Sequence, residues 1–228
     1  MSKVLACSDL HGQGDLWEEI KKFLNEDDIL YILGDSGDRG PDGWRMIKEV
    51  LDMPNVIYIL GNHDVMLMNS LKDKEVGLHI RNGGRTTLDS LKWNENYSRY
   101  IEKLRHCPIN ATYRNKNNQM IFMNHSGCIS TNPWEQIWDR THYLDHDNHG
   151  YDYIIHGHTP IEIMIDDFNH YNKFFLKEYQ YDWKQGKVCY YNSGNKINID
   201  CGAFWYNFTI LLDLDTFEEN LIGEVTYP

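Results

Sequence analysis

Short apolar runs alternate with amphipathic segments over the first sixty residues of the chain. The runs at 4–7, 29–33 and 56–60 have the length and composition of buried strands. The segments at 16–24 and 44–51 repeat apolar residues at helical spacing and carry polar residues on the opposite face. Strands that alternate with helices predict an α/β fold with a parallel sheet, whose functional groups lie beyond the carboxyl ends of the strands.

The second half of the chain has a different pattern. Residues 65–106 are predicted to be helical, and 113–124 to form a hairpin. After a strand at 151–155, short β-like runs dominate: 161–165, 187–191, 196–200, 207–213 and 221–226. We predict a second sheet packed on the first. Because no repeat, low-complexity tract or linker interrupts the chain, residues 1–228 are expected to form one domain, in which 166–195 fit loop, hairpin or partner surface equally well.

Polar side chains follow five of the predicted strands. The loop Gly34-Asp35-Ser36-Gly37-Asp38-Arg39-Gly40 carries two carboxylates and a guanidinium, and its glycines allow a sharp turn. Taken alone, it could be an ordinary surface turn. The other strand ends, however, carry residues of metal-ligand type: Asp9, His11, Asn62, His125 and His158. We therefore expect these loops to lie side by side and to form one site.

This ligand set favours two metal ions. Imidazoles combined with carboxylates and an amide oxygen suit Mn, Fe or Zn better than Ca or Mg. Six ligands are too many for one tetrahedral ion, but they fit two divalent cations that share a bridging carboxylate, for which Asp35 is the natural candidate. Mn²⁺ is our first choice, with Fe or Zn as alternatives.

Composition and charge limit the partners. The 228 residues carry a formal net charge of −12, which argues against nucleic acid or an anionic membrane as a partner. An anionic substrate could still bind where metal ions concentrate positive charge. The five cysteines have no CxxC spacing, and the chain has neither a long apolar leader nor a membrane-length apolar run. We expect free thiols and a cytoplasmic protein.

Taken in order, the motifs resemble the signature of the calcineurin-like metallophosphoesterases. They are Asp9-Leu10-His11-Gly12, Gly34 to Gly40, Gly61-Asn62-His63-Asp64, His125-Ser126-Gly127 and Gly157-His158-Thr159-Pro160. The Asp38-Arg39-Gly40 ending is similar to the phosphoprotein phosphatase branch, especially the bacterial and phage lambda-type enzymes. The segment 199–203 resembles the C-terminal Asp-Thr-Gly-Ala of that family. The resemblance implies a sandwich of two mixed β-sheets flanked by helices, classed as α/β or α+β.

The resemblance also assigns the metal ligands. Asp9 and His11 would hold the first ion, Asp35 would bridge, and the second ion would be held by Asn62, His125 and His158. Other members of the superfamily have a further histidine where this chain has Pro160, so water is expected to complete that shell. His156 is not a ligand position of the family, and we interpret it as a supporting residue.

The implied mechanism is hydrolysis by in-line attack of a metal-bridging hydroxide on phosphorus. His63 is the expected general acid and Asp38 its orienting carboxylate. Arg39 and Arg140 are expected to bind the phosphate, together with Asn62. Arg140 lies in Ile137-Trp138-Asp139-Arg140, which resembles the segment that supplies the second phosphate-binding arginine of the family. An alternative for Arg140 is a surface ion pair.

The substrate remains open at this point. Phosphorylated serine and threonine in proteins, with tyrosine as a further possibility, come first. The alternative is symmetrical cleavage of a dinucleoside polyphosphate by a bis(5′-nucleosyl)-tetraphosphatase, and the remote alternative is a catalytically silent metal-binding scaffold. The segment Asn82-Gly83-Gly84-Arg85-Thr86-Thr87-Leu88 resembles one in the bacterial enzymes, but we interpret it as a helix end followed by a new helix start.

Overall fold

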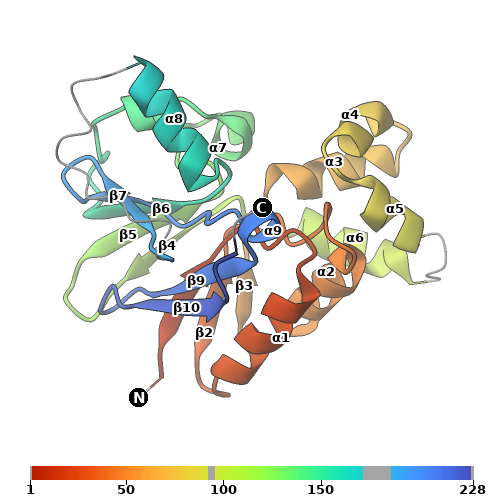
Figure 1. Cartoon of the computed structure of the whole chain (residues 1–228), viewed down its shortest axis with the longest axis horizontal. Helices are drawn as coiled ribbons and strands as arrows, with labels where there is room; N and C mark the ends of the chain where they lie inside the picture. Colours follow the sequence, from red (N-terminus) through yellow and green to blue (C-terminus); the bar gives the residue numbers. More distant parts are fainter. Residues whose placement is uncertain (1, 92–95, 172–185, 227–228) are drawn as a thin grey trace.

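A computed structural model describes residues 2–91, 96–171 and 186–226, which form two five-stranded sheets (Figure 1). The strands of the first sheet are β1 (Val4–Cys7), β2 (Ile29–Ile32), β3 (Val56–Tyr58), β9 (Phe208–Asp213) and β10 (Glu219–Gly223). Those of the second are β4 (Asn110–Arg114), β5 (Met120–Asn124), β6 (Tyr153–His156), β7 (Cys189–Tyr191) and β8 (Lys196–Asn198).

Both sheets are mixed. The first has the order β10-β9-β1-β2-β3, in which β1, β2 and β3 run parallel and β9 and β10 are antiparallel additions. The second has the order β4-β5-β6-β8-β7, with a parallel centre of β5, β6 and β8. The carboxyl ends of the parallel strands carry the loops that the sequence singles out.

Helices cover the outer faces of this sandwich (Figure 1). Those of the first half are α1 (Gly14–Phe23), α2 (Gly43–Asp52), α3 (Asn62–Ser70), α4 (Val76–Arg81), α5 (Arg85–Leu91) and α6 (Tyr97–Arg105). The others are α7 (Pro133–Trp138), the 3-10 turn η1 (His142–Leu144), α8 (Ile161–Tyr171) and the single turn α9 (Ala203–Tyr206).

Side chains that alternate along the strands build two hydrophobic cores. In β1, Leu5 and Cys7 pack with the helical residues Leu16 and Trp17, whereas Ala6 packs in the core that joins the two sheets. This is the period-two pattern of a strand that is buried on both faces. The strand ends, and the loops that follow them, are therefore held from both sides.

The predicted sandwich of two sheets is confirmed, and so are the three parallel strands and the hairpin, which pairs β4 with β5. The strand predicted at 161–165 is wrong, because these residues begin α8. Ile161 and Met164 are buried three residues apart while Ile163 is exposed, which is helical rather than alternating burial. Residues 172–185 of the open segment 166–195 lie outside the described residues. Within the described part of the chain, no helix has the length and apolarity needed to cross a membrane.

Candidate metal centre and phosphate site

The polar side chains predicted at the strand ends come together at one edge of the two sheets. All six predicted metal ligands are buried: Asp9, His11, Asp35, Asn62, His125 and His158. Hydrogen bonds between the loops set their spacing. Within the first sheet His11 N donates to Asp35 O at 2.9 Å, and within the second Gly157 N donates to His125 O at 2.9 Å. His158 N donates to Asp9 Oδ2 at 2.9 Å between the sheets, so the loops of the two sheets form one continuous floor.

The backbone of this site is unusual. The left-handed region of φ is occupied by six of its non-glycine residues: Asp9, His11, Asp35, Asp38, Arg39 and His158. Asp tolerates this conformation better than most residues, but each case has a cost that the surrounding structure must offset. Such backbone strain gathers at functional sites, because it aims side chains in directions that regular structure does not allow.

Two glycines leave room for the carboxylates. A Cβ atom at Gly61 would collide with the Asp35 carboxylate, and one at Gly157 would collide with that of Asp9. Each glycine directly precedes a predicted metal ligand, Asn62 or His158. The close approach of backbone and acid therefore explains why these two positions carry no side chain.

Two groups of donor atoms share Asp35. The first contains His11, Asp35 and His63, and the second contains Asp35, His125 and His158; within each, the possible ligand atoms lie within 4.8 Å of one another. This arrangement fits the predicted bridge. It adds His63, which is expected to act as the acid, to the residues predicted to hold the first ion.

His125 shows why a cation fits here. Its Nδ1 donates to Leu33 O at 2.6 Å, so the lone pair of Nε2 faces Asn62 Oδ1 at 3.0 Å and Asp35 Oδ2 at 3.3 Å. Three acceptors facing one another require a positive charge between them. Burial alone would lower the pKa of His125, but the charges of Asp35 and Asp9 raise it to about 10. A divalent cation would satisfy the same demand, so the residues fit a metal ion.

Asp9 lies beside the first group. Its Oδ1 is 3.8 Å from His11 Nε2, while its Oδ2 accepts hydrogen bonds from the Ser8 hydroxyl and from His158 N. His11 Nδ1 donates to Gly37 O at 3.1 Å, which turns Nε2 toward the site. Burial raises the pKa of Asp9, and a bound cation would oppose this by stabilising the ionised form.

The predicted pairing of His63 with Asp38 is present in the structure. His63 Nδ1 lies 2.7 Å from Asp38 Oδ2, and a second imidazole, from His79, places Nε2 2.8 Å from the same oxygen. Burial would raise the pKa of Asp38, but the bonds to His63 and His79 outweigh it and lower the pKa to about 2. Asp38 is thus an ionised acceptor shared by two histidine N–H donors.

Sequence reasoning missed His79. It is fully buried in α4, 41 residues from Asp38 along the chain, and it belongs to no motif. Among the described residues its Nδ1 has no hydrogen-bond partner. The ring donates to Asp38 through Nε2, since an ionised carboxylate oxygen can only accept.

The segment 82–88 also does more than was expected. The predicted helix end and new start are confirmed, since α4 ends at Arg81 and α5 begins at Arg85. In addition, Gly83 O accepts from Arg39 N at 2.9 Å, and Thr87 Oγ1 accepts from Asp38 N at 2.9 Å. This corner holds the backbone of the loop that carries both residues.

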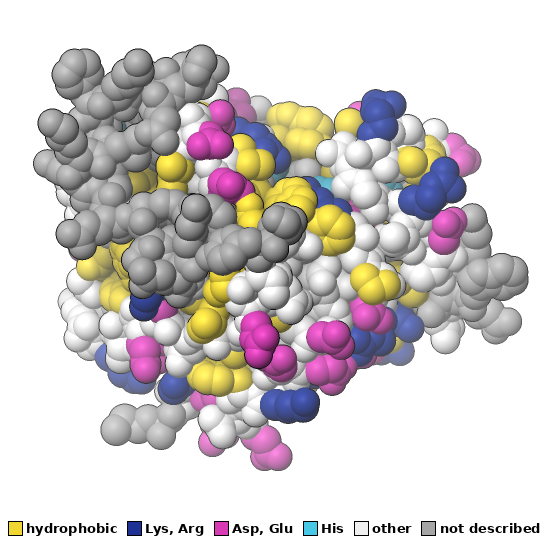
Figure 2. Space-filling view, in the orientation of Figure 1, with side chains coloured by type: hydrophobic (Ala, Val, Ile, Leu, Met, Phe, Trp, Pro, Cys, Tyr) yellow, Lys and Arg dark blue, Asp and Glu magenta, His cyan; other side chains and the backbone are white. Residues whose placement is uncertain are grey.

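The two predicted phosphate-binding arginines differ in their surroundings. Arg39 Nη2 lies 3.3 Å from His63 Nε2, and its guanidinium lies 5.0 Å from the ring centroid of Trp205. Arg140 is exposed but lies close to His158. The pKa of His158 is held well below its ordinary value, first by burial, then by the charge of His125 and then by that of Arg140. Figure 2 shows histidine atoms in a hollow of this face, bordered by Lys or Arg atoms and by hydrophobic side chains over α9.

Two further buried acids support the site. Asp64 Oδ2 accepts from Gly61 N at 2.9 Å and from Asp35 N at 3.3 Å. Burial, followed by the charge of Asp35, raises the pKa of Asp64 to about 7. Asp200 accepts from Gly202 N at 3.0 Å, and burial and then Asp9 raise its pKa well above normal. Both acids belong to motifs that were recognised in the sequence, but the sequence did not assign a role to either of them.

The comparison with family profiles decides the identity of this site. The profile described as calcineurin-like phosphoesterase matches residues 2–162, which include every predicted metal ligand. The chain belongs to the calcineurin-like phosphoesterase family. Its centre is therefore that of a metal-dependent phosphoesterase with a dinuclear site. None of the curated proteins matches the chain closely enough to count as a relative.

Solved structures show the same fold at low identity. A metallophosphoesterase from Sphaerobacter thermophilus is 17% identical with a TM-score of 0.60, over 100% of this chain and 89% of that one. A protein serine/threonine phosphatase from Saccharomyces cerevisiae is 13% identical with a TM-score of 0.59, over 100% and 81%. A cold-active protein-tyrosine phosphatase of a psychrophilic Shewanella species is 13% identical with a TM-score of 0.53, over 98% and 81%.

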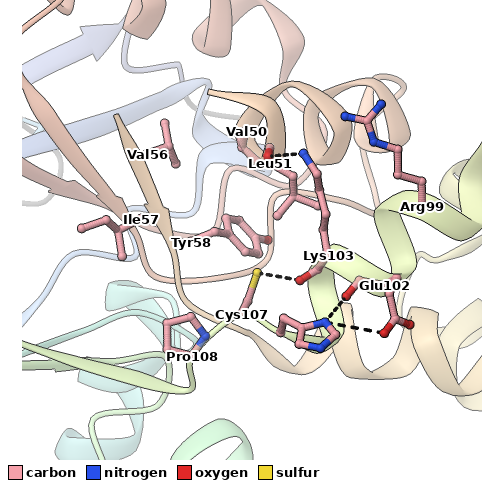
Figure 3. A pocket seen from close by; sticks show the side chains of 11 residues that line it. Val50, Leu51, Val56, Ile57, Tyr58, Arg99, Glu102, Lys103, Cys107 and Pro108 are labelled. Atoms are coloured by element: carbon pink, nitrogen blue, oxygen red, sulfur yellow. Dashed lines mark hydrogen bonds and ion pairs between the residues drawn. The ribbon is translucent and has the colours of Figure 1, made fainter. Parts of the chain in front are cut away.

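A separate hollow of this calcineurin-like phosphoesterase lies away from the centre. It has a volume of about 720 Å³ and is lined by β3, α2 and α6 and by the residues that follow α6 (Figure 3). Its wall is mostly apolar, with Arg99 and Lys103 at the rim. It contains none of the predicted ligands or phosphate-binding residues.

Proposed function

We propose that this phosphoesterase is a phosphoprotein phosphatase that removes phosphate from serine, threonine and tyrosine side chains. The observation that carries the proposal is the sharing of Asp35 by two groups of donor atoms, next to the His63–Asp38 pair and Arg39. This geometry supports a site in which metal ligands, a proton donor and an anion-binding group lie at one edge of the sheets.

The residues that would hold the two ions are those of the prediction. Asp9 and His11 would bind one ion, Asn62, His125 and His158 the other, and Asp35 both. When bound, the divalent cations would neutralise phosphate oxygens and acidify a water molecule. The mixed nitrogen and oxygen donors support Mn²⁺, with Fe or Zn as alternatives.

The protein's own residues manage the leaving oxygen. Ionised Asp38 accepts from His63 Nδ1, which fixes the tautomer and turns Nε2 toward the site. In the structure, Arg39 Nη2 donates to this Nε2 at 3.3 Å. A phosphate that engages Arg39 would release Nε2, which could then carry the proton required by the departing alkoxide.

The choice between protein and dinucleotide substrates needs a direct experiment. We propose to strip the protein of metal, reload it with Mn²⁺, and measure kcat/KM for a phosphopeptide and for diadenosine tetraphosphate in parallel. The proposal predicts a preference for the phosphopeptide. A preference of about a hundredfold for the dinucleotide, a free-energy difference of about 2.7 kcal/mol, would contradict it and identify a tetraphosphatase.

The silent-scaffold alternative has its own test. Turnover of p-nitrophenyl phosphate that depends on Mn²⁺ would exclude it, and so would turnover of a phosphoserine peptide that is reduced in His63→Asn. The expected loss on a substrate with a poor leaving group is of the order of 10²–10⁴, the usual contribution of a general acid. Metal content, measured on the same samples, should match the wild type.

A further inference from the structure

Large apolar side chains are exposed beside Arg39. Eight large hydrophobic side chains are exposed in the described part of the chain, and three of them, Ile163, Phe204 and Trp205, lie together, each about 40% exposed. Ile163 and Trp205 line one small pocket, and the ring of Phe204 contacts that of Trp205. Single exposed hydrophobic residues are common, but a cluster next to a binding site suggests a ligand-binding surface.

The single turn α9 presents two of these side chains. Ala203 and Tyr206 point into the protein, while Phe204 and Trp205 remain exposed, with their rings in an edge-on contact at 6.1 Å. The turn is fixed at its start, because Gly202 N donates to buried Asp200 at 3.0 Å. Figure 2 shows this hydrophobic surface over α9 at the border of the hollow with the histidines.

Trp205 joins the phosphate site to a pocket. Its ring lies 5.0 Å from the Arg39 guanidinium, and the same side chain lines a hollow of about 180 Å³ together with Pro160, Glu162, Ile163 and Tyr206. Pro160 comes two residues after the predicted ligand His158. The organic group of a phosphate ester bound at Arg39 would therefore lie next to this pocket, separated from it only by the Trp205 indole.

The size and charge of the pocket select among phosphate esters. A cavity of about 150 Å³ is known to bind one benzene ring, so about 180 Å³ suits a single six-membered ring better than a purine. The short side chains of phosphoserine and phosphothreonine would leave it unfilled. The Glu162 carboxylate, which is hydrogen-bonded to the Tyr206 hydroxyl, would repel the additional phosphates of a polyphosphate chain.

We propose that Trp205, Phe204 and the adjoining pocket bind the aromatic ring of the substrate, so that the enzyme favours phosphotyrosine over phosphoserine in a peptide. This inference rests on the proposed phosphomonoesterase function. It deepens that function by assigning a specificity site to residues that sequence reasoning did not single out.

The test compares Trp205→Ala and Trp205→Phe with wild type on two peptides that differ only in phosphotyrosine or phosphoserine. The ratio of kcat/KM values is the readout, since the better leaving group of phosphotyrosine cancels between variants. We expect Trp205→Ala to lower the phosphotyrosine-to-phosphoserine ratio about tenfold, mainly through KM, and Trp205→Phe to keep most of it. Tyr97→Ala is the matched control, because Tyr97 is 42% exposed but belongs to α6.

A binding measurement separates this inference from the proposed function. Phenylphosphonate and methylphosphonate are not hydrolysed, and their dissociation constants for the Mn²⁺-loaded protein can be measured by calorimetry. Trp205→Ala should weaken phenylphosphonate about tenfold and methylphosphonate much less. Equal weakening of both, or of neither, would overturn the inference. If neither peptide is hydrolysed, the proposed function fails, and the phosphonates still decide the role of Trp205.

Discussion

The two arginine-bearing loops of this molecule are held in different ways. Arg39 lies in a short loop whose backbone is bonded to the α4–α5 corner at Gly83, while His79 holds the neighbouring Asp38. Arg140 lies in the long connection between β5 and β6, and its side chain is exposed. Arg39 is thus fixed through polar contacts that also hold Asp38, the partner of His63.

The Arg140 connection is fixed two residues further on. His142 is buried, with Nε2 3.3 Å from His156 Nε2, and buried Lys196 donates to Asp145 O at 2.6 Å. None of these atoms bonds to His63 or Asp38. We therefore expect the supports of Arg39 to influence the chemical step and those of Arg140 to influence substrate binding.

The largest expected contrast is between the arginines themselves. Arg39→Ala should lower kcat/KM for a phosphopeptide by about 10²–10³, the usual effect of removing one positioned donor to a developing anion. Arg140→Ala should lower it only about tenfold, and mainly through KM, because the exposed guanidinium acts in a higher dielectric. Steady-state kinetics with metal content as control would measure this, and equal losses would contradict the different roles of the two arginines.

His79 provides the next test. His79→Leu removes one donor from Asp38 and should lower kcat about tenfold for a phosphoserine peptide, while His79→Gln, which keeps an N–H near Nε2, should recover most of it. The loss should nearly vanish for p-nitrophenyl phosphate, whose leaving group needs no proton. It should also vanish in an Asp38→Asn background. A loss that is the same for both substrates would mean that His79 only supports the fold.

Replacing Lys196 should have a smaller effect, and on KM rather than on kcat. Lys196→Met removes the donor to the Asp145 carbonyl and should raise KM a few-fold with little change in kcat, because the connection that carries Arg140 loses one anchor. The free energy of unfolding should fall by about 1.5–3 kcal/mol, the usual contribution of a hydrogen bond to a charged group. Urea unfolding and kinetics on the same sample would check this, and an altered kcat with unchanged KM would contradict it.

The smallest effect concerns pH. Burial, followed by the charges of His156 and Lys196, holds the pKa of His142 well below its ordinary value. The unfolded chain therefore binds a proton below about pH 6.5 that the folded chain does not, and stability is lost as pH falls from there. His142→Gln should remove up to about 1.4 kcal/mol per pH unit of this slope between pH 6.5 and 5. Identical slopes of variant and wild type in urea unfolding would disprove it.

The sequence predicted those parts of the site that stand directly after strands. The apolar runs at 29–33 and 56–60 are buried on both faces, so their ends are easily recognised, and Asp35 and Asn62 follow them. Parallel pairing then brings these ends together without further information. That is why the six predicted ligands converge as expected.

The residues that the sequence did not reveal, His79 and Trp205, contact the site from positions far away along the chain. His79 is an isolated histidine in a helix, and only the packing of α4 against the 34–40 loop gives it a partner. Trp205 lies in a single turn, where two exposed aromatic residues look like any others in sequence. The wrong prediction of a strand at 161–165 has a similar cause. The β-branched residues Ile161, Ile163 and Ile165 favour a strand in the sequence, but the packing of these residues in the fold favours the helix α8.

The most direct test of the account is metal binding by Asp35→Asn. Calorimetric titration of the chelated wild-type protein with Mn²⁺ should give two ions per chain, and phosphopeptide turnover should appear with the second. Because Asp35 belongs to both donor groups, Asp35→Asn should bind fewer than two ions and lose turnover. A variant that still binds two ions with wild-type affinity and turns over normally would contradict a centre built on a shared Asp35.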